Sequence, residues 1–323
     1  MEIVSGQIID DSIYLATELL EIAKKKESRQ EKSKKRQFAR LVKDKGAIKA
    51  TQQLTDQVIR IDSSQASAKM FRSIVRKVKS KGFSLIDYFG LKLLGLFSYI
   101  LRPVVLFIVT ERVRIASKGI INNANPRKLK KYLRKKSKTN LDINLNLLGE
   151  AVLGEEEADK RFNELLNLMD LEEVNYISVK ISAIVSQIIP SDSNGSFERV
   201  AKKLRVIYRK ALKNKCFVNL DMEEFKDFEI TIDVLKQLLM EEEFKNLYAG
   251  IVLQAYLPEA HSVFDDLLNW SKKRYETYGS KIKIRLVKGA NLAMERTEAE
   301  LHGWNPAPYN TKEEVDASYS RLI

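Results

Sequence analysis

Six charged or amide side chains stand at or just after the ends of short β-rich segments in the second half of this 323-residue sequence. Parallel strands are buried on both faces and are usually apolar along their length, so a polar strand end is a candidate for chemistry. In β/α barrels these carboxyl ends meet at one face, where the active site lies. Each residue taken alone also fits a structural ion pair inside a barrel, but together they predict an active site. They are Glu150, Lys180, Asp221, Gln254, Arg285 and Lys288.

Five β-rich segments must position these residues, and amphipathic segments separate them. The spacing from strand to strand is about 30 to 40 residues, which indicates right-handed parallel β-α units. The expected helices cover residues 155–171, 196–213, 223–246 and 258–278. The expected strands are Asp142–Leu148, Asn175–Ile181, Cys216–Asp221, Ala249–Gln254 and Ile282–Val287.

This pattern predicts an α/β fold, the first five βα units of a (β/α)8 barrel. A doubly wound sheet is the alternative, but LLGEAVLGEEE, after the first strand, lacks the G-x-G-x-x-G phosphate loop of that fold. A closed eight-stranded barrel takes about 250 residues. We therefore expect residues 141–323 to form a barrel that is truncated before closure.

Residues 1–140 have a different pattern, which is helical and basic. Apolar residues within 12–26 and 36–61 recur three and four apart, and ANPRK around Pro126 indicates a break between helices. This part holds 32 Lys+Arg against 12 Asp+Glu, so its net charge is larger than the formal net charge of +13 of the whole chain. We expect a basic helical N-terminal arm over residues 1–140.

The two densest basic runs, Lys24–Arg36 and Arg127–Lys138, have two interpretations. They are solvated helix faces, or they attract an anionic membrane surface, to which each base contributes on the order of 1 kcal/mol. No zinc-finger, recognition-helix or aromatic-interleaved pattern accompanies them, so we expect no specific nucleic-acid partner.

Composition excludes other classes of protein. A single cysteine, Cys216, allows no internal disulfide, and two histidines make a histidine-built metal site improbable, so we expect no metal. The acidic N-terminus is not that of a secretory signal, which favours the cytoplasm. The apolar stretch Leu91–Val109 is interrupted by Lys92, Arg102 and Pro103, so we expect a buried helix pair broken at Pro103 rather than a membrane span.

Five motifs carry a resemblance to a known family. They are LLGEAVLG (147–154), YISVKISAI (176–184), VNLDMEE (218–224), VLQAYLPEA (252–260) and IRLVKGANLAMERTEAELHGW (284–304). In this order they closely resemble the proline dehydrogenase domain, and most nearly that of bacterial bifunctional enzymes in which a glutamate-semialdehyde dehydrogenase domain follows in the same chain. The resemblance covers residues 141–323, and the helices before residue 140 resemble the family's arm only loosely.

The resemblance implies FAD-dependent oxidation of L-proline to 1-pyrroline-5-carboxylate. A hydride passes from the ring carbon next to the proline nitrogen to N5 of FAD, and the reduced flavin delivers electrons to a membrane quinone. The implied partners are therefore L-proline, the quinone and a downstream aldehyde dehydrogenase domain.

The resemblance also implies which residues bind the cofactor. Arg285 corresponds to an arginine beside flavin N5 and O4, where a fixed cation favours the reduced ring. Gln254 corresponds to a glutamine that hydrogen-bonds the flavin. Lys288, Gly289 and Ala290 correspond to a loop that contacts the cofactor, where glycine permits close backbone approach.

Three further residues correspond to the substrate side of the family's site. Lys180 matches a lysine that faces the substrate carboxylate, and Asp221 matches an acid near the flavin. Glu150 matches an acid that pairs with an arginine at the pocket mouth. The resemblance thus predicts Lys180, Asp221 and Arg285 as catalytic residues, with Glu150 and Lys180 in the substrate pocket.

Two departures from the family pattern limit what we expect of this chain. Asn291 stands where many members have an aromatic residue, so aromatic packing on the cofactor is lost there. The eighth helix, with its tyrosine and two arginines for the proline carboxylate, is absent. We therefore expect an N-terminal fragment that is weak or inactive alone. The alternative is a non-catalytic protein that binds a membrane surface, on the inner face of the membrane, or another anionic partner through the basic arm.

Overall fold

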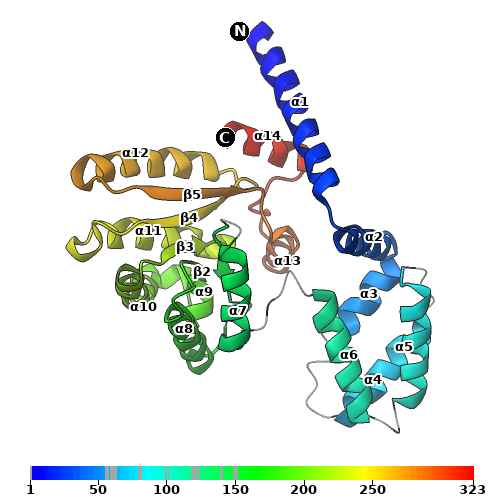
Figure 1. Ribbon diagram of the computed structural model, residues 1–323. Coiled ribbons are helices and arrows are strands. Elements are labelled where there is room, and N and C mark those ends of the chain that lie inside the picture. The colour runs from blue at the N-terminus through cyan, green and yellow to red at the C-terminus, as the bar shows by residue number, and fades with distance from the viewer. Residues whose placement is uncertain are drawn as a thin grey trace. The chain divides into compact units, whose positions relative to one another are not determined.

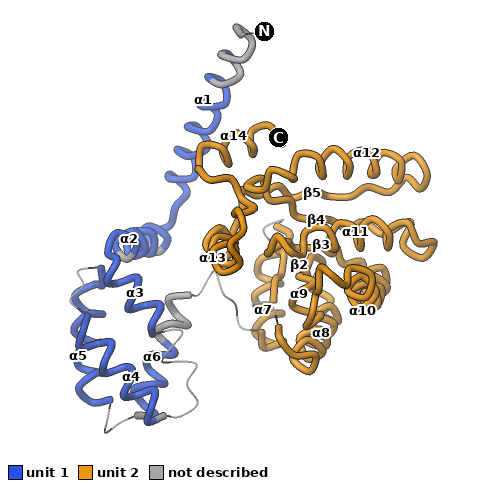
Figure 2. The backbone as a smooth tube through the Cα atoms, turned by 180° about the vertical axis from the view of Figure 1, so that it is seen from behind, with its two compact units in different colours: residues 1–122 blue, residues 123–323 orange. Residues whose placement is uncertain are grey.

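The computed structural model describes residues 2–54, 58, 64–78, 82–98, 100, 102–117, 122, 124–138, 141–147 and 152–323. They fall into two compact units, residues 1–122 and residues 123–323 (Figure 2). The boundary precedes the change of sequence pattern near residue 140. The reason is that α7 (Pro126–Ser137) buries Leu129 and Leu133 in the core of the second unit.

The first unit is helical. Within the helical region expected over residues 36–61, Asp44 begins a new helix, because its carboxylate accepts hydrogen bonds from the N–H groups of Gly46 and Ala47. The described helices are α1 (Glu2–Lys26), α2 (Arg29–Lys43), α3 (Lys45–Gln53), α4 (Ser64–Lys77), α5 (Leu85–Phe97) and α6 (Arg102–Ser117).

The apolar stretch Leu91–Val109 forms two helices rather than one, as expected. Pro103 lies in the first turn of α6, where its missing N–H group leaves no donor unpaired. The expected burial is only partly correct: Val105 and Val109 are buried, but Leu93 is 59% exposed and Phe107 is 66% exposed. Among the described residues, no helix combines the length and the apolar character that a bilayer crossing demands.

The second unit is built on one parallel sheet of five strands in the order β1-β2-β3-β4-β5 (Figure 1). Each strand pairs with its neighbours in the sequence, and this order separates the fold from a doubly wound sheet, whose strand order reverses. The expectation of five parallel βα units is confirmed. The strands are β1 (Leu145–Asn146), β2 (Tyr176–Lys180), β3 (Phe217–Asp221), β4 (Ala249–Gln254) and β5 (Ile282–Val287).

The helices that alternate with the strands pack on the apolar face of this sheet. On β2, Ile177 and Val179 are buried in one core with Leu204 and Leu235 of the covering helices. The expected helix over residues 223–246 is shorter at both ends, because a 3-10 helix at Phe225–Asp227 precedes it and the α-helix covers only Phe228–Leu238. The helices of this unit are α8 (Glu155–Met169), α9 (Ile181–Ile184), α10 (Ser193–Asn214), α11 (Phe228–Leu238), α12 (Ala260–Tyr278), α13 (Leu292–His302) and α14 (Lys312–Leu322), besides α7.

The opposite face of the sheet carries polar and aromatic side chains. Near the amino ends of the strands, the ammonium of Lys283 lies 4.9 Å from the ring centre of Tyr176 and 5.2 Å from that of Phe217. Nearer the carboxyl ends, Ser178 and Asn219 are buried. Alternate residues of a strand project from the same face. Ser178 and Asn219 therefore share this face with Lys180 and Asp221 at the ends of the same strands.

Arg274 on α12 is the largest fully buried side chain that carries a charge. Its guanidinium donates hydrogen bonds to five backbone carbonyl groups, and no carboxylate is among these acceptors. The acceptors belong to Leu239, Phe244, Lys245, Leu247 and Lys281. Arg274 therefore satisfies four backbone carbonyl groups of the loop between α11 and β4 and one carbonyl group just before β5.

We expect Arg274→Met to lower the free energy of unfolding by about 3 kcal/mol or more, because it strands several buried carbonyl groups. Urea unfolding followed by circular dichroism measures the change. Lys273→Met, at an exposed position of the same helix, is the matched control and should change little. Equal stabilities of the two variants would contradict this role of Arg274.

Candidate active site

The carboxyl ends of β2, β3 and β5 bring three predicted residues to one edge of the sheet. The register pairs Lys180 with Asp221, and it pairs Val252 on β4 with Arg285. Paired residues of parallel strands project from the same face, so all three charged side chains lie on the polar face. The prediction that the polar strand ends converge is therefore met at Lys180, Asp221 and Arg285.

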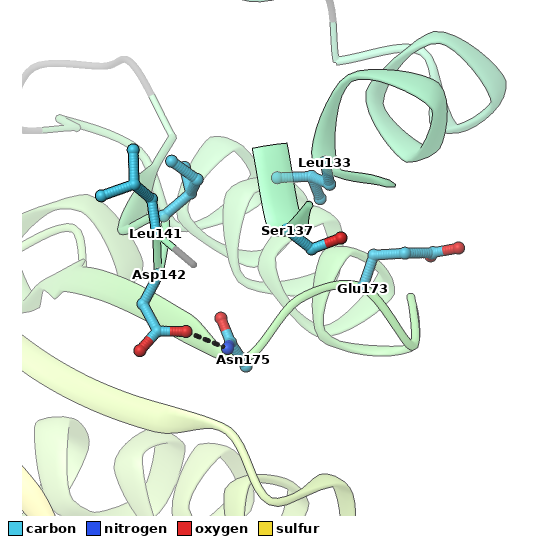
Figure 3. Close-up of a pocket in the computed structure, with 7 residues that line it drawn as sticks. Leu133, Ser137, Leu141, Asp142, Glu173 and Asn175 are labelled. Carbon is cyan, nitrogen blue, oxygen red and sulfur yellow. Dashed lines mark hydrogen bonds between the residues drawn. The ribbon is translucent and has the colours of Figure 1, made fainter. Parts of the chain in front are cut away.

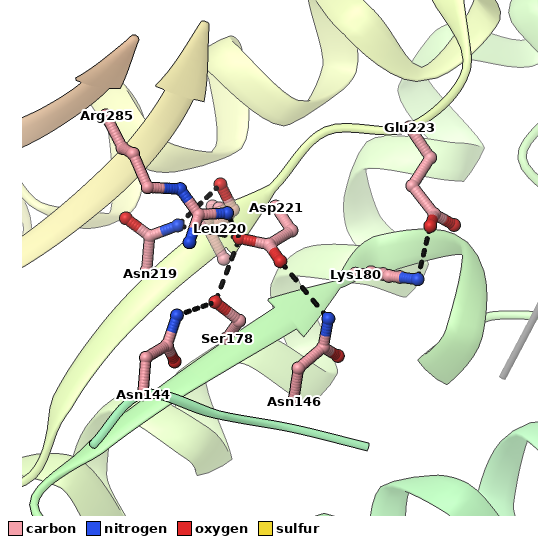
Figure 4. Close-up of polar contacts among 9 residues, drawn as sticks. All are labelled: Asn144, Asn146, Ser178, Lys180, Asn219, Leu220, Asp221, Glu223 and Arg285. Carbon is pink, nitrogen blue, oxygen red and sulfur yellow. Dashed lines mark hydrogen bonds and ion pairs between the residues drawn. The ribbon is translucent and has the colours of Figure 1, made fainter. Parts of the chain in front are cut away.

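Asp221 is the centre of this edge (Figure 4). Its Oδ1 atom accepts a hydrogen bond from Arg285 Nη2 at 2.7 Å, and the two side chains form an ion pair. The same oxygen accepts from Ser178 Oγ at 2.9 Å and from Asn219 Nδ2 at 2.8 Å. Oδ2 receives one longer contact, 3.4 Å from Asn146 Nδ2.

A second ion pair lies beside the first, between Lys180 and Glu223 (Figure 4). The side chain of Lys180 is 14% exposed and that of Glu223 is 27% exposed, so both are largely shielded from solvent. The backbone carbonyl of Glu223 also accepts from Asn291 Nδ2 at 2.9 Å. Glu223 thus links the cation of β2 to the loop after β5. The sequence analysis missed Glu223, although it lies in the motif VNLDMEE.

Gln254, at the end of β4, is buried and holds the same loop. Its Oε1 atom accepts from the N–H of Ala290 at 3.3 Å, and its Nε2 atom donates to the carbonyl of Glu223 at 3.3 Å. Gly289 has a φ of 135°, and a Cβ atom there would lie 2.4 Å from the ring of Tyr256. Only glycine fits this position, because both the backbone and the neighbouring ring exclude a side chain.

One predicted residue, Lys288, does not join this group. Lys288 directs its ammonium to Asp316 of α14, with a distance of 2.5 Å between Nζ and Oδ1, so it pairs with a helix rather than with the strand ends. Glu150 lies outside the described residues.

A buried acid lies behind the loop that follows β3. Asp227 is 3% exposed, and its Oδ1 atom has no hydrogen-bond partner. Burial, reinforced by the carboxylate of Glu224, raises the pKa of Asp227 from 3.8 to about 7. Burial likewise raises the pKa of Glu295, which accepts a hydrogen bond from the N–H of Phe225 at 2.8 Å.

Two hollows of the second unit lie at opposite ends of the strands. The larger, of about 340 Å³, lies at the amino ends and is lined by Asp142 and Asn175, whose side chains hydrogen-bond at 2.8 Å (Figure 3). The smaller, of about 160 Å³, lies at the carboxyl ends of β1 and β2 and is lined mostly by α8 and α9, with Lys180 and Ser178 at its border. Within the part of the chain that the structure describes, no group of three or more His, Cys, Asp or Glu residues could hold a metal ion.

Comparison with known proteins agrees with this arrangement. A sequence profile of the proline dehydrogenase family matches residues 129–323, more than half of the chain. The chain belongs to the proline dehydrogenase family. The match begins inside α7, the helix that packs on the core of the second unit.

The relatives that this family member resembles are longer proteins. The bifunctional protein PutA of Klebsiella aerogenes is 30% identical over 145 residues, which cover 44% of this chain and 11% of that protein. The structure of proline utilization A from Corynebacterium freiburgense is 48% identical with a TM-score of 0.61, and the match covers 62% of this chain and 21% of that one. The structure of proline utilization A from Bdellovibrio bacteriovorus, inactivated by N-propargylglycine, is 27% identical with a TM-score of 0.67, and the match covers 87% of this chain and 28% of that one.

The raised pKa of Asp227 makes the stability of this proline dehydrogenase family member depend on pH. The folded state keeps the proton up to about pH 7, whereas the unfolded state loses it near the ordinary value of 3.8. The stability that the neutral acid contributes is therefore lost as the pH rises through this range.

We expect Asp227→Asn, which stays neutral, to be more stable than the parent protein at pH 8 by up to about 4 kcal/mol, and to differ little at pH 4. Urea unfolding at several pH values measures this. Asp233→Asn, at an exposed position of α11, is the control and should leave the pH dependence unchanged. Parallel pH profiles for the parent and Asp227→Asn would show that Asp227 is not protonated in the folded state.

Proposed function

We propose that this chain provides the flavin-facing and substrate-facing part of a FAD-dependent proline dehydrogenase, which oxidises L-proline to 1-pyrroline-5-carboxylate. The observation that carries the proposal is the meeting of two ion pairs, Arg285 with Asp221 and Lys180 with Glu223, at one edge of a parallel sheet. Barrel enzymes place their chemistry at this edge. Family membership supplies the choice of reaction.

The residues present fit a flavin. Arg285 Nε is a buried donor without a hydrogen-bond partner, so it can donate to an acceptor atom of a bound ring. Both hydrogen bonds of Gln254 are 3.3 Å long, so they compete only weakly with a ligand. FAD, when bound, would supply the hydride acceptor. We propose that Arg285, Gln254 and the loop Lys288–Ala290 hold it.

The substrate side of the proposal rests on Lys180. Its ammonium lies at the polar edge of the sheet, where it pairs with Glu223, and a carboxylate such as that of L-proline is the complementary group. Asp221 fixes the guanidinium of Arg285 by a charge-assisted hydrogen bond, which places that cation before any ligand arrives. We assign Glu150 to the same pocket by the family resemblance alone.

The remaining partners follow from the family. We propose that a membrane quinone takes the electrons. Because relatives are named as bifunctional proteins, we also propose that the parent protein carries a downstream aldehyde dehydrogenase domain. The chain spans a small share of those relatives, so we propose that residues 123–323 belong to a barrel with five of its eight βα units and that residues 1–122 form its arm. We expect weak or no turnover of proline by this chain alone.

We expect the chain to bind FAD and Arg285→Met to weaken that binding about tenfold or more, because the variant removes a charged donor. Quenching of flavin fluorescence in a titration measures the affinity, and a proline:quinone assay with added FAD measures turnover. Arg209→Met is the matched control, since Arg209 pairs with Glu243 on the covering helices. Equal affinities of Arg285→Met and the parent for FAD would refute the assignment of Arg285.

A second candidate function is binding to an anionic membrane surface, either beside catalysis or in its place. Large apolar side chains on α5, on α6 and between them are each more than half accessible. The same unit carries the basic helix α2 and three lysines in the last turn of α1. Such a surface suits the boundary between acyl chains and anionic head groups at the inner face of the membrane. The exposed set is Leu85, Ile86, Phe89, Leu93, Leu96, Ile100, Val104 and Phe107.

We expect the chain to co-sediment with phosphatidylglycerol vesicles at low salt and less at high salt, because screening weakens attraction between exposed charges. The double variant Ile86→Ser, Phe89→Ser should bind less. Leu153→Ser, at an apolar residue of the second unit that is 93% exposed, is the control and should bind like the parent. Absence of sedimentation at low salt would remove this candidate.

A further inference from the structure

Three of the four donors around Asp221 come from neutral side chains, and three donors meet one oxygen. Oδ1 accepts from Arg285 Nη2, Ser178 Oγ and Asn219 Nδ2, all within 2.9 Å. A carboxylate needs only one of these contacts to neutralise an arginine. The two further hydrogen bonds come from Ser178 on β2 and Asn219 on β3, so two strands hold the carboxylate in place (Figure 4).

The proton of Ser178 has a defined direction. Asn144 donates from Nδ2 to Ser178 Oγ at 2.8 Å, which occupies a lone pair of the hydroxyl. The hydroxyl hydrogen is then directed to Asp221 Oδ1. A chain of hydrogen bonds therefore runs from Asn144, before β1, through Ser178 on β2 to Asp221 on β3, which binds the guanidinium of Arg285.

Burial makes these polar residues costly unless they perform this role. Ser178 is 2% exposed and Asn219 is fully buried, in strands whose other buried positions are apolar. An apolar side chain of similar size would occupy these positions without the desolvation cost of a hydroxyl or an amide. The arrangement also leaves Arg285 Nε buried without a partner, which means that the guanidinium is held by one end only.

We propose that Ser178 and Asn219 are positioning residues, which hold the carboxylate of Asp221 and through it the guanidinium of Arg285 on the polar face of the sheet. The ligand in this inference, FAD, comes from the proposed function. The geometry of the hydrogen bonds does not depend on that function. Asn144 acts one step further away, because it sets the direction of the Ser178 hydroxyl. None of the three touches the reacting atoms.

The first experiment needs no flavin. Arginine-selective 15N NMR of the full chain observes rotation about the Cζ–Nη bonds of Arg285, and the signal is assigned by its loss in Arg285→Lys. Separate Nη signals are expected for the parent, because the bond to Asp221 slows rotation. Ser178→Ala and Asn144→Ala should average these signals, whereas Ser178→Thr, which retains the hydroxyl, should restore them.

Ser196→Ala is the matched control for loss of a buried serine hydroxyl. Ser196 is fully buried on α10 and bonds the backbone of Ile189, so its loss changes stability but not Arg285. Unchanged Arg285 signals in Ser178→Ala, or equal averaging in Ser196→Ala, would overturn the inference.

The second experiment adds FAD. Ser178→Ala and Asn219→Ala should weaken FAD binding about tenfold, and Ser178→Thr should bind like the parent. If the NMR result holds but the parent binds no FAD, the proposed function fails while the positioning role stands. If the parent binds FAD and Ser178→Ala binds it equally with an unchanged guanidinium, the positioning role fails alone.

Discussion

The hydrogen-bonded ion pair between Arg285 and Asp221 is the interaction on which the edge of the sheet depends. Arg285 is in register with Val252 of β4, so its guanidinium must cross β4 to reach Asp221 on β3 at 2.7 Å. The contact therefore joins two strands that are not neighbours and covers Val252, which is buried. This contact can form only when β3, β4 and β5 pair in the observed register. The positions of the two charges therefore depend on the sheet as a whole.

A second constraint is that the charges of the side chains at this edge of the sheet balance one another. Two cations, Arg285 and Lys180, face two carboxylates, Asp221 and Glu223, with most of the four side chains shielded from water. A buried charge without a partner would cost several kcal/mol, so the pairs allow charges to remain at this position. The same pairs fix the cations in place before a ligand binds, which is the form of preorganisation that catalysis by electrostatics requires.

The loop after β5 shows how the edge is completed from the backbone. Gly289 is compressed against Tyr256, Ala290 donates to Gln254, and Asn291 bonds the carbonyl of Glu223. These contacts tie the ends of β3, β4 and β5 into one layer. Asn291 therefore links the loop after β5 to the loop after β3.

The sequence by itself determined the five parallel strands, their order of appearance and three of the polar strand ends that converge. It did so because hydrophobic periodicity and strand spacing are local properties, and strand bounds such as Ala249–Gln254 and Ile282–Val287 were predicted to the residue. Tertiary structure alone decided the partners. Lys288 is paired with Asp316 of α14, Glu223 and Ser178 join the site, and α7 belongs to the second unit, because each outcome depends on contacts between residues 28 or more positions apart. A pattern along the chain carries no information on which distant side chain completes a hydrogen bond, so only the packed sheet could show that Asp221 binds Arg285.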